Sequence, residues 1–223
     1  MNAQTTINTH QALSPKQQHI IQIAAISAKG DLPILERNLN AGPDAGLSIN
    51  EIKETLVHLY AYCGFPRSLR GLQTFMKVLD ERKARGINDK QGVEASPIQD
   101  ERSKYERGKA ILEELSGLAE KGPKTGYAAF APEIEVFLKE HLFADIFERD
   151  VLTYAERELV TISVLSSIGG VEPMLRSHFN LCLNVGLTPQ QLQQFAGIIE
   201  TTLGKEQAKA TQAVLNEVLK NNK

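Results

Sequence analysis

The chain contains an internal duplication, in which residues 13–79 come back at residues 152–219. The two copies align at an offset of 139 residues over their first stretch and, after one inserted residue, at an offset of 140. The aligned identities include Ile23/Ile162, Ser27/Ser166, Gly30/Gly169, Leu47/Leu187, Gly64/Gly204 and Val78/Val218. A repeat of this length constrains the fold more than any other feature, because any architecture that ignores it would be wrong as a whole.

The two copies have diverged in complementary places. The second copy has His178 where the first has Asn38, and the first copy has a Tyr-Cys-Gly-Phe-Pro loop at 62–66 where the second has unrelated residues at 202–206. A single surviving site would therefore use the first half of the second copy and the second half of the first copy.

The pattern of apolar residues is helical throughout, and no stretch alternates apolar and polar residues as a strand does. Helix start signals include Ser14-Pro15 and the capping-box pattern from Ser48 to Glu51, and Gly30 is a typical stop signal. The sequence therefore predicts an all-α fold, a duplicated helical bundle.

The repeat and the composition together predict four segments. Residues 1–12 form a polar N-terminal tail, and residues 13–83 form the first repeat. Residues 84–101 are rich in charge, Gly, Asn, Ser and Pro, which is typical of a linker that is flexible at least in part. Residues 102–223 form the second repeat, preceded by leader helices.

Composition limits the possible partners. The net charge of −2, with both signs spread along the chain, argues against nucleic acid, which needs a basic face. No apolar run is long enough to cross a membrane, and no signal peptide is visible. Cys63 and Cys182 occupy non-equivalent positions in the two copies, so we expect free thiols and a cytoplasmic protein.

His178 is the first candidate for chemistry. Cys182 lies four residues later on the same helix face, so the pair could join a general base to a thiol or form half of a metal site. The alternative is an ordinary helix histidine beside a buried thiol. No further ligands stand at a recognisable spacing, so we expect no metal. Glu158, in the preceding helix, could orient His178 through its other ring nitrogen.

The second candidate set lies in the first copy. His58 and Tyr62 are four residues apart on one helix face, and Cys63 follows. Gly64 and Pro66 are explained as a turn between two helices. His58, considered alone, is expected to be exposed or lightly buried.

Several motifs, in this order, resemble the carboxymuconolactone decarboxylase family. They are Tyr105–Gly108, Glu156–Thr161, Leu175–His178 and Asn184–Thr188, with Leu56–Pro66 of the first copy supplying the family's later signature. The resemblance covers most of the chain outside residues 1–12 and 84–101. It implies the helical fold shared with alkylhydroperoxidase D-like proteins.

The resemblance implies one of two activities. One branch of the family decarboxylates γ-carboxymuconolactone in aromatic-acid breakdown. The other uses a Cys-x-x-Cys motif followed by a histidine, and counting back from His178 places those cysteines at Val171 and Met174. Disulfide-exchange peroxidase chemistry therefore lacks its thiols, although Cys63 or Cys182 could react with peroxide alone.

The decarboxylase branch implies a cofactor-free lyase acting on a small carboxylated lactone or enol acid. In that interpretation His178 transfers the proton, Arg176 binds the substrate carboxylate, and Glu158 orients the histidine. His58, Tyr62, Cys63 and Cys182 are then candidates for lining the pocket.

The resemblance also implies a ring-like assembly. Because relatives form rings of one-copy subunits, a two-copy chain is expected to form a homotrimer that resembles a hexamer. The alternatives to the lyase are a thiol-dependent antioxidant with peroxiredoxin activity, and a non-catalytic oligomeric protein that binds small acids.

Overall fold

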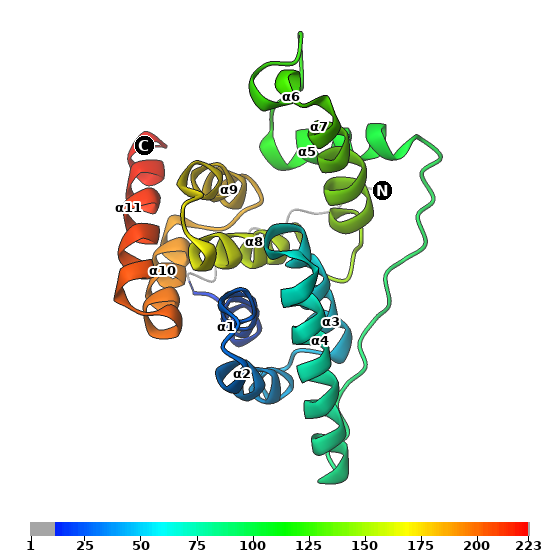
Figure 1. Ribbon diagram of the computed structural model, residues 1–223, viewed down its shortest axis with the longest axis vertical. Coiled ribbons are helices and arrows are strands. Elements are labelled where there is room, and N and C mark those ends of the chain that lie inside the picture. Colours follow the sequence, from blue (N-terminus) through cyan, green and yellow to red (C-terminus); the bar gives the residue numbers. More distant parts are fainter. Residues whose placement is uncertain (1–11, 223) are drawn as a thin grey trace.

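The computed structural model describes residues 12–222 of the 223-residue chain. Within these residues the chain forms helices joined by loops and contains no strand, so the all-α prediction is confirmed (Figure 1). The predicted N-terminal tail, apart from Ala12, lies outside the described residues. In the same part of the chain, no helix combines the length and the apolar character that crossing a membrane requires.

The duplication is visible in the helix boundaries. The bounds of α8 are those of α1 plus 139 residues, and the bounds of α9 are those of α2 plus 140. The first copy consists of α1 (Pro15–Lys29), α2 (Leu32–Asp44), α3 (Ile49–His58) and α4 (Tyr60–Ala84). The second consists of α8 (Tyr154–Ile168), α9 (Glu172–Asn184), α10 (Pro189–Leu203) and α11 (Lys205–Asn221).

Equivalent helices begin in the same way in both copies. A capping box, in which the side chains of the N-cap and N3 residues bond each other's backbone N–H groups, opens α1, α3, α8 and α10. The N-cap residues are Ser14, Ser48, Thr153 and Thr188. Local sequence therefore defines these helix starts before any tertiary contact is made.

Gly64 breaks the helical path of the first copy. Its φ of 81° and ψ of 163° kink α4, and the equivalent Gly204, with φ 108°, separates α10 from α11. Only glycine adopts these values without strain. The turn predicted at Gly64 is thus present as a kink inside one long helix.

The core lies between the two copies, which share it. Helices α1 and α8 pack against each other at the centre of the molecule (Figure 1). In α8 the ten consecutive residues 157–166 are all buried, as expected for a helix surrounded by other helices. One hydrophobic cluster contains residues of both copies, so the two repeats form a single folding unit.

The leader segment forms a second layer, drawn at the top of Figure 1. It consists of α5 (Lys104–Ser116), α6 (Gly126–Phe130), α7 (Pro132–Phe137) and the π-helix η1 (Leu138–Phe147). The segment has its own smaller core, centred on Leu115, Phe143 and Phe147. Helices are therefore present before the second repeat, and the last of them, Leu138–Phe147, winds as a π-helix.

The linker carries no helix between the end of α4 and the start of α5, and it is tied to the start of α3. The backbone N–H groups of Ile49 and Asn50 donate to the carbonyls of Lys90 and Gln91, both at 2.9 Å. The Asn50 side-chain amide also donates to the Val93 carbonyl at 3.0 Å. These bonds hold part of the linker against the first repeat.

Candidate functional site

The centre of the site is a hydrogen-bonded pair of side chains from two helices of the second copy. Nδ1 of His178 on α9 lies 2.7 Å from Oε2 of Glu158 on α8. The Glu158 side chain is fully buried, whereas that of His178 is 14% exposed. A carboxylate at this distance fixes the ring orientation and holds a proton on Nδ1, which leaves Nε2 for an incoming molecule. The predicted orienting role of Glu158 is consistent with this geometry.

Tyr62 connects this pair to the first copy. Its ring meets the ring of His178 edge to face at 5.7 Å between centroids and stacks on the ring of His58 at 5.6 Å. Burial raises the pKa of Tyr62, and the Glu158 carboxylate raises it further, so the hydroxyl stays neutral. Residues from both copies therefore meet at one place, as the complementary divergence predicts.

His58 is fully buried, so the expectation that it is exposed or lightly buried is wrong. Its Nδ1 lies 3.2 Å from Nη1 of Arg157, which can only donate, and its Nε2 lies 3.0 Å from Oγ1 of Thr161. Nδ1 must then accept, and Nε2 carries the proton. Burial and the charge of Arg157 hold the pKa of His58 well below its ordinary value. The ring is a neutral structural neighbour of Tyr62.

Behind His58 lies a buried charge network that the sequence analysis did not anticipate. Nη2 of Arg157, a fully buried side chain, donates to Oε1 of Glu54 at 2.8 Å, and Nε of Arg149 donates to the same oxygen at 2.9 Å. Burial alone would raise the pKa of Glu54, but the hydrogen bonds from the two arginines lower it. The only sequence signal for this network was a pair of charged residues inside apolar helix faces.

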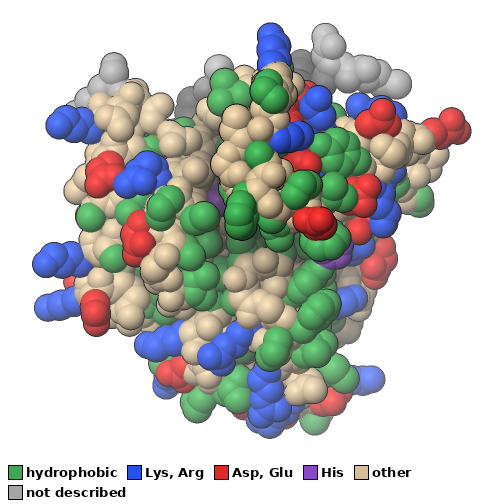
Figure 2. Space-filling view, turned by 45° about the horizontal axis from the view of Figure 1, so that its top comes forward, with side chains coloured by type: hydrophobic (Ala, Val, Ile, Leu, Met, Phe, Trp, Pro, Cys, Tyr) green, Lys and Arg blue, Asp and Glu red, His purple; other side chains and the backbone are tan. Residues whose placement is uncertain are grey.

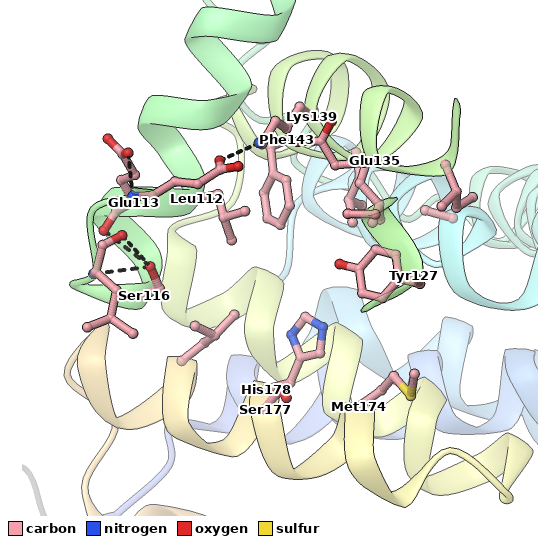
Figure 3. A pocket seen from close by; sticks show the side chains of 18 of the residues that line it. Leu112, Glu113, Ser116, Tyr127, Glu135, Lys139, Phe143, Met174, Ser177 and His178 are labelled. Carbon is pink, nitrogen blue, oxygen red and sulfur yellow. Dashed lines mark hydrogen bonds and ion pairs between the residues drawn. The ribbon is translucent and has the colours of Figure 1, made fainter. Parts of the chain in front are cut away.

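A cavity of about 870 Å³ opens beside His178, between α9, the start of α4 and the leader segment (Figure 3). Most of its wall is apolar, and its size is typical of a site for a small organic molecule. Lining side chains include Tyr62, Leu112, Phe143, Leu165, Met174 and His178. A charged group, Glu120, Lys124, Glu135 and Lys139, also lines it. The sequence analysis missed these four residues.

Arg176 does not lie with His178. Its side chain is 42% exposed, its Nη2 is 2.5 Å from Oε2 of Glu217 on α11, and it takes no part in lining the cavity. Two residues along a helix correspond to a rotation of about 200°, so Arg176 and His178 face different ways. The predicted carboxylate-binding role of Arg176 has no support in this geometry.

Neither cysteine reaches the cavity. Cys182 is fully buried, and burial raises the pKa of its thiol. Cys63 is partly buried, its Sγ donates to the Leu59 carbonyl at 3.2 Å, and burial raises its pKa to about 11. Thiols held in the protonated form are poor nucleophiles, which weakens the thiol-antioxidant alternative. Among residues 12–222, no group of three or more His, Cys, Asp or Glu side chains is placed to hold a metal ion.

The fold and the site together define a class of protein, a duplicated all-α bundle with a Glu–His pair beside an apolar cavity. The sequence profile of the carboxymuconolactone decarboxylase family matches residues 1–75 and 132–217, well over half of the chain. The chain therefore belongs to the carboxymuconolactone decarboxylase family. No curated protein matches its sequence.

Proposed function

We propose that the chain is a cofactor-free lyase that decarboxylates a small carboxylated lactone or enol acid, with His178 as the proton-transfer residue. The observation that carries the proposal is the 2.7 Å pair of His178 and Glu158 at the wall of an apolar cavity. A histidine oriented by a buried carboxylate can hold and deliver a proton at a fixed point.

The reaction would proceed in two steps. The bond from the substrate carbon to its carboxylate breaks, CO2 leaves, and the electron pair is delocalised into the neighbouring carbonyl as an enolate. Nε2–H of His178 then donates its proton to the enolate carbon. Glu158, bonded to Nδ1, stabilises the doubly protonated ring before this transfer. The edge of Tyr62 against His178 keeps the ring in place.

The direct test measures CO2 release from γ-carboxymuconolactone and close analogues. The wild-type chain is compared with His178→Ala and with the control His141→Ala, at an exposed histidine that does not line the cavity. General acid catalysis contributes about 10²–10⁴-fold, so His178→Ala should lose that much while the control keeps wild-type turnover. Turnover that survives in His178→Ala, or no turnover of any analogue by the wild-type chain, would overturn the lyase.

The homotrimer expected from the family resemblance is likewise proposed, with support from exposed apolar side chains on the leader segment. Phe130 is 93% exposed and Leu118 is 73% exposed, with Tyr127 and Phe137 also exposed nearby. Figure 2 shows hydrophobic side chains gathered around a hollow on one face of the molecule. Exposed apolar patches of this kind mark contact surfaces. Light scattering should give three times the chain mass, and a monomer mass would contradict the trimer.

A further inference from the structure

A buried lysine stands in the wall of the cavity across from His178. Lys139, on η1, is 2% exposed and lines the cavity, and Figure 3 shows it on the wall opposite His178. It forms ion pairs with Glu135, one turn earlier on the same helical path, and with Glu120. A buried ammonium requires such partners, because an unpaired charge is costly away from water.

Glu120, Lys124, Glu135 and Lys139 form a charged cluster, and helices hold one half of it. The Tyr105 hydroxyl on α5 donates to Oε1 of Glu135 at 2.8 Å, and Nζ of Lys139 lies 3.2 Å from the same hydroxyl. A side chain at Gly108 would place its Cβ 1.8 Å from the Lys139 carbonyl, so α5 lies directly against the backbone of Lys139. Lys139, Glu135 and Tyr105 are therefore positioned by helix packing.

The other half comes from a loop. Glu120 and Lys124 lie in residues 117–125, between α5 and α6, which have no helical structure. The Glu120 side chain is 31% exposed, and its backbone N–H donates to Oε1 of Glu113 at 2.8 Å. Glu120 also pairs with Lys124. One carboxylate of the cluster is thus carried by a loop and already reaches solvent.

The charges of the cluster balance, with two lysines and two glutamates. If a ligand carboxylate replaced Glu120 as the partner of Lys139, and the Glu120 side chain rotated into solvent, the net charge around Lys139 would stay the same. Glu135 cannot be replaced in this way, because the helix holds it one turn from Lys139. Glu120 is therefore the displaceable partner.

We propose that Lys139 is the carboxylate anchor of the cavity, and that Glu120 stands on Lys139 where a ligand carboxylate would bind. The anchor supplies the cation that Arg176 does not provide. The link to catalysis rests on the proposed lyase function, whereas binding of a carboxylate by Lys139 does not depend on it.

The anchor also narrows the substrate class. An ion pair with Lys139 stabilises a carboxylate in the ground state, and loss of CO2 would remove that stabilisation, so anchoring the departing group would oppose the reaction. The carboxylate on Lys139 is therefore one that the substrate keeps. A substrate of this site carries two carboxylates on a small, otherwise apolar ring, with the departing one nearer His178.

Calorimetric titration with benzoate tests the anchor, and benzamide is the neutral probe of the same shape. The variants are Lys139→Met and Glu120→Gln, with Lys109→Met and Glu114→Gln on α5 as controls outside the cavity lining. Benzoate competes with the Glu120 carboxylate for Lys139, so it should bind about tenfold tighter to Glu120→Gln, which lacks that competitor. It should bind about tenfold or more weaker to Lys139→Met, which lacks the cation. The controls should match the wild type, and benzamide should not distinguish any variant.

The anchor is overturned if benzoate binds Glu120→Gln no tighter than wild type, or if folded Lys139→Met binds it as the wild type does. Glu120→Gln alters only a partly exposed loop side chain, so it tests the anchor even if Lys139→Met fails to fold. Benzoate binding through Lys139 without CO2 release would uphold the anchor and reject the lyase, whereas CO2 release with Lys139-independent binding would reject the anchor alone.

Discussion

At the scale of single residues, Glu158 is the hydrogen-bond partner of His178 Nδ1, and the proposed lyase function makes this bond testable. Glu158→Gln should lower kcat for CO2 release about a hundredfold or more with little change in KM. The reason is that a neutral amide cannot stabilise the positive charge of the doubly protonated His178 ring. The control is Glu156→Gln, two residues away, where glutamine still completes the capping box of α8. Steady-state kinetics check this, and a Glu158→Gln variant with wild-type kcat would contradict the role.

His58 should make stability depend on pH. Its pKa is well below 6.5 in the folded protein, so below about pH 6.5 the unfolded chain binds a proton that the folded chain excludes. Stability should therefore fall as the pH falls below 6.5, with a slope of up to about 1.4 kcal/mol per pH unit from this group.

Urea unfolding between pH 7.5 and pH 5 measures this slope. His58→Gln should flatten it, since the glutamine amide can donate to Thr161 and accept from Arg157 without titrating in this range. An unchanged slope in His58→Gln would show that the ring is not held neutral.

At the scale of elements, the packing of α5 on η1 depends on Gly108. An added Cβ would lie 1.8 Å from the Lys139 carbonyl, so Gly108→Ala should destabilise the protein by about 1–3 kcal/mol. Gly197→Ala is the matched control, because Gly197 lies inside α10 with open space around it. That change should stabilise by about 0.5–1 kcal/mol through helix propensity. Urea unfolding separates the two, and equal stability changes would contradict the close approach.

The helices were predictable at their ends but not in their winding. Capping residues such as Ser48 and Thr153 act through their own backbone neighbourhood, so local sequence is enough to place them. The π-helix η1 is different, because the apolar pattern of its sequence does not distinguish a π-helix from an α-helix. Its backbone lies against Gly108 of α5, and a contact between segments so far apart in the chain cannot be read from the periodicity of either one.

At the scale of the whole molecule, the sequence predicted a site shared between copies because the divergence itself was visible. Tyr62 and His178 meet as expected, although no short motif joins them. Lys139 was not predicted, since a lysine four residues after Glu135 has the pattern of an ordinary exposed helix pair. Arg176 was assigned to the substrate carboxylate through the family resemblance, and in the structure its side chain pairs with Glu217 and does not line the cavity. The orientation of both side chains depends on how their helices are rotated in the packed molecule, which the sequence pattern does not specify.

The duplication also supplies a test of how the copies are joined. Glu54 of the first copy and Arg157 of the second form a buried ion pair between them. Gln194 of the second copy is equivalent to Glu54, and Gln18 of the first copy is equivalent to Arg157. Both glutamines form hydrogen bonds with the backbone of Leu13. The molecule thus uses charges at one junction and neutral amides at its pseudo-symmetric counterpart.

Removing one charge from this junction should cost far more than removing both. Glu54→Gln leaves the guanidinium of Arg157 buried without its main counter-charge, and breaking such a pair costs about 3–5 kcal/mol. The double change Glu54→Gln/Arg157→Gln copies the neutral junction, so it should recover most of that loss. Urea unfolding of wild type, both single variants and the double variant gives the coupling energy directly. A double variant whose loss equals the sum of the single losses would show that the two side chains are not coupled, and that the charges do not act as a pair across the copies.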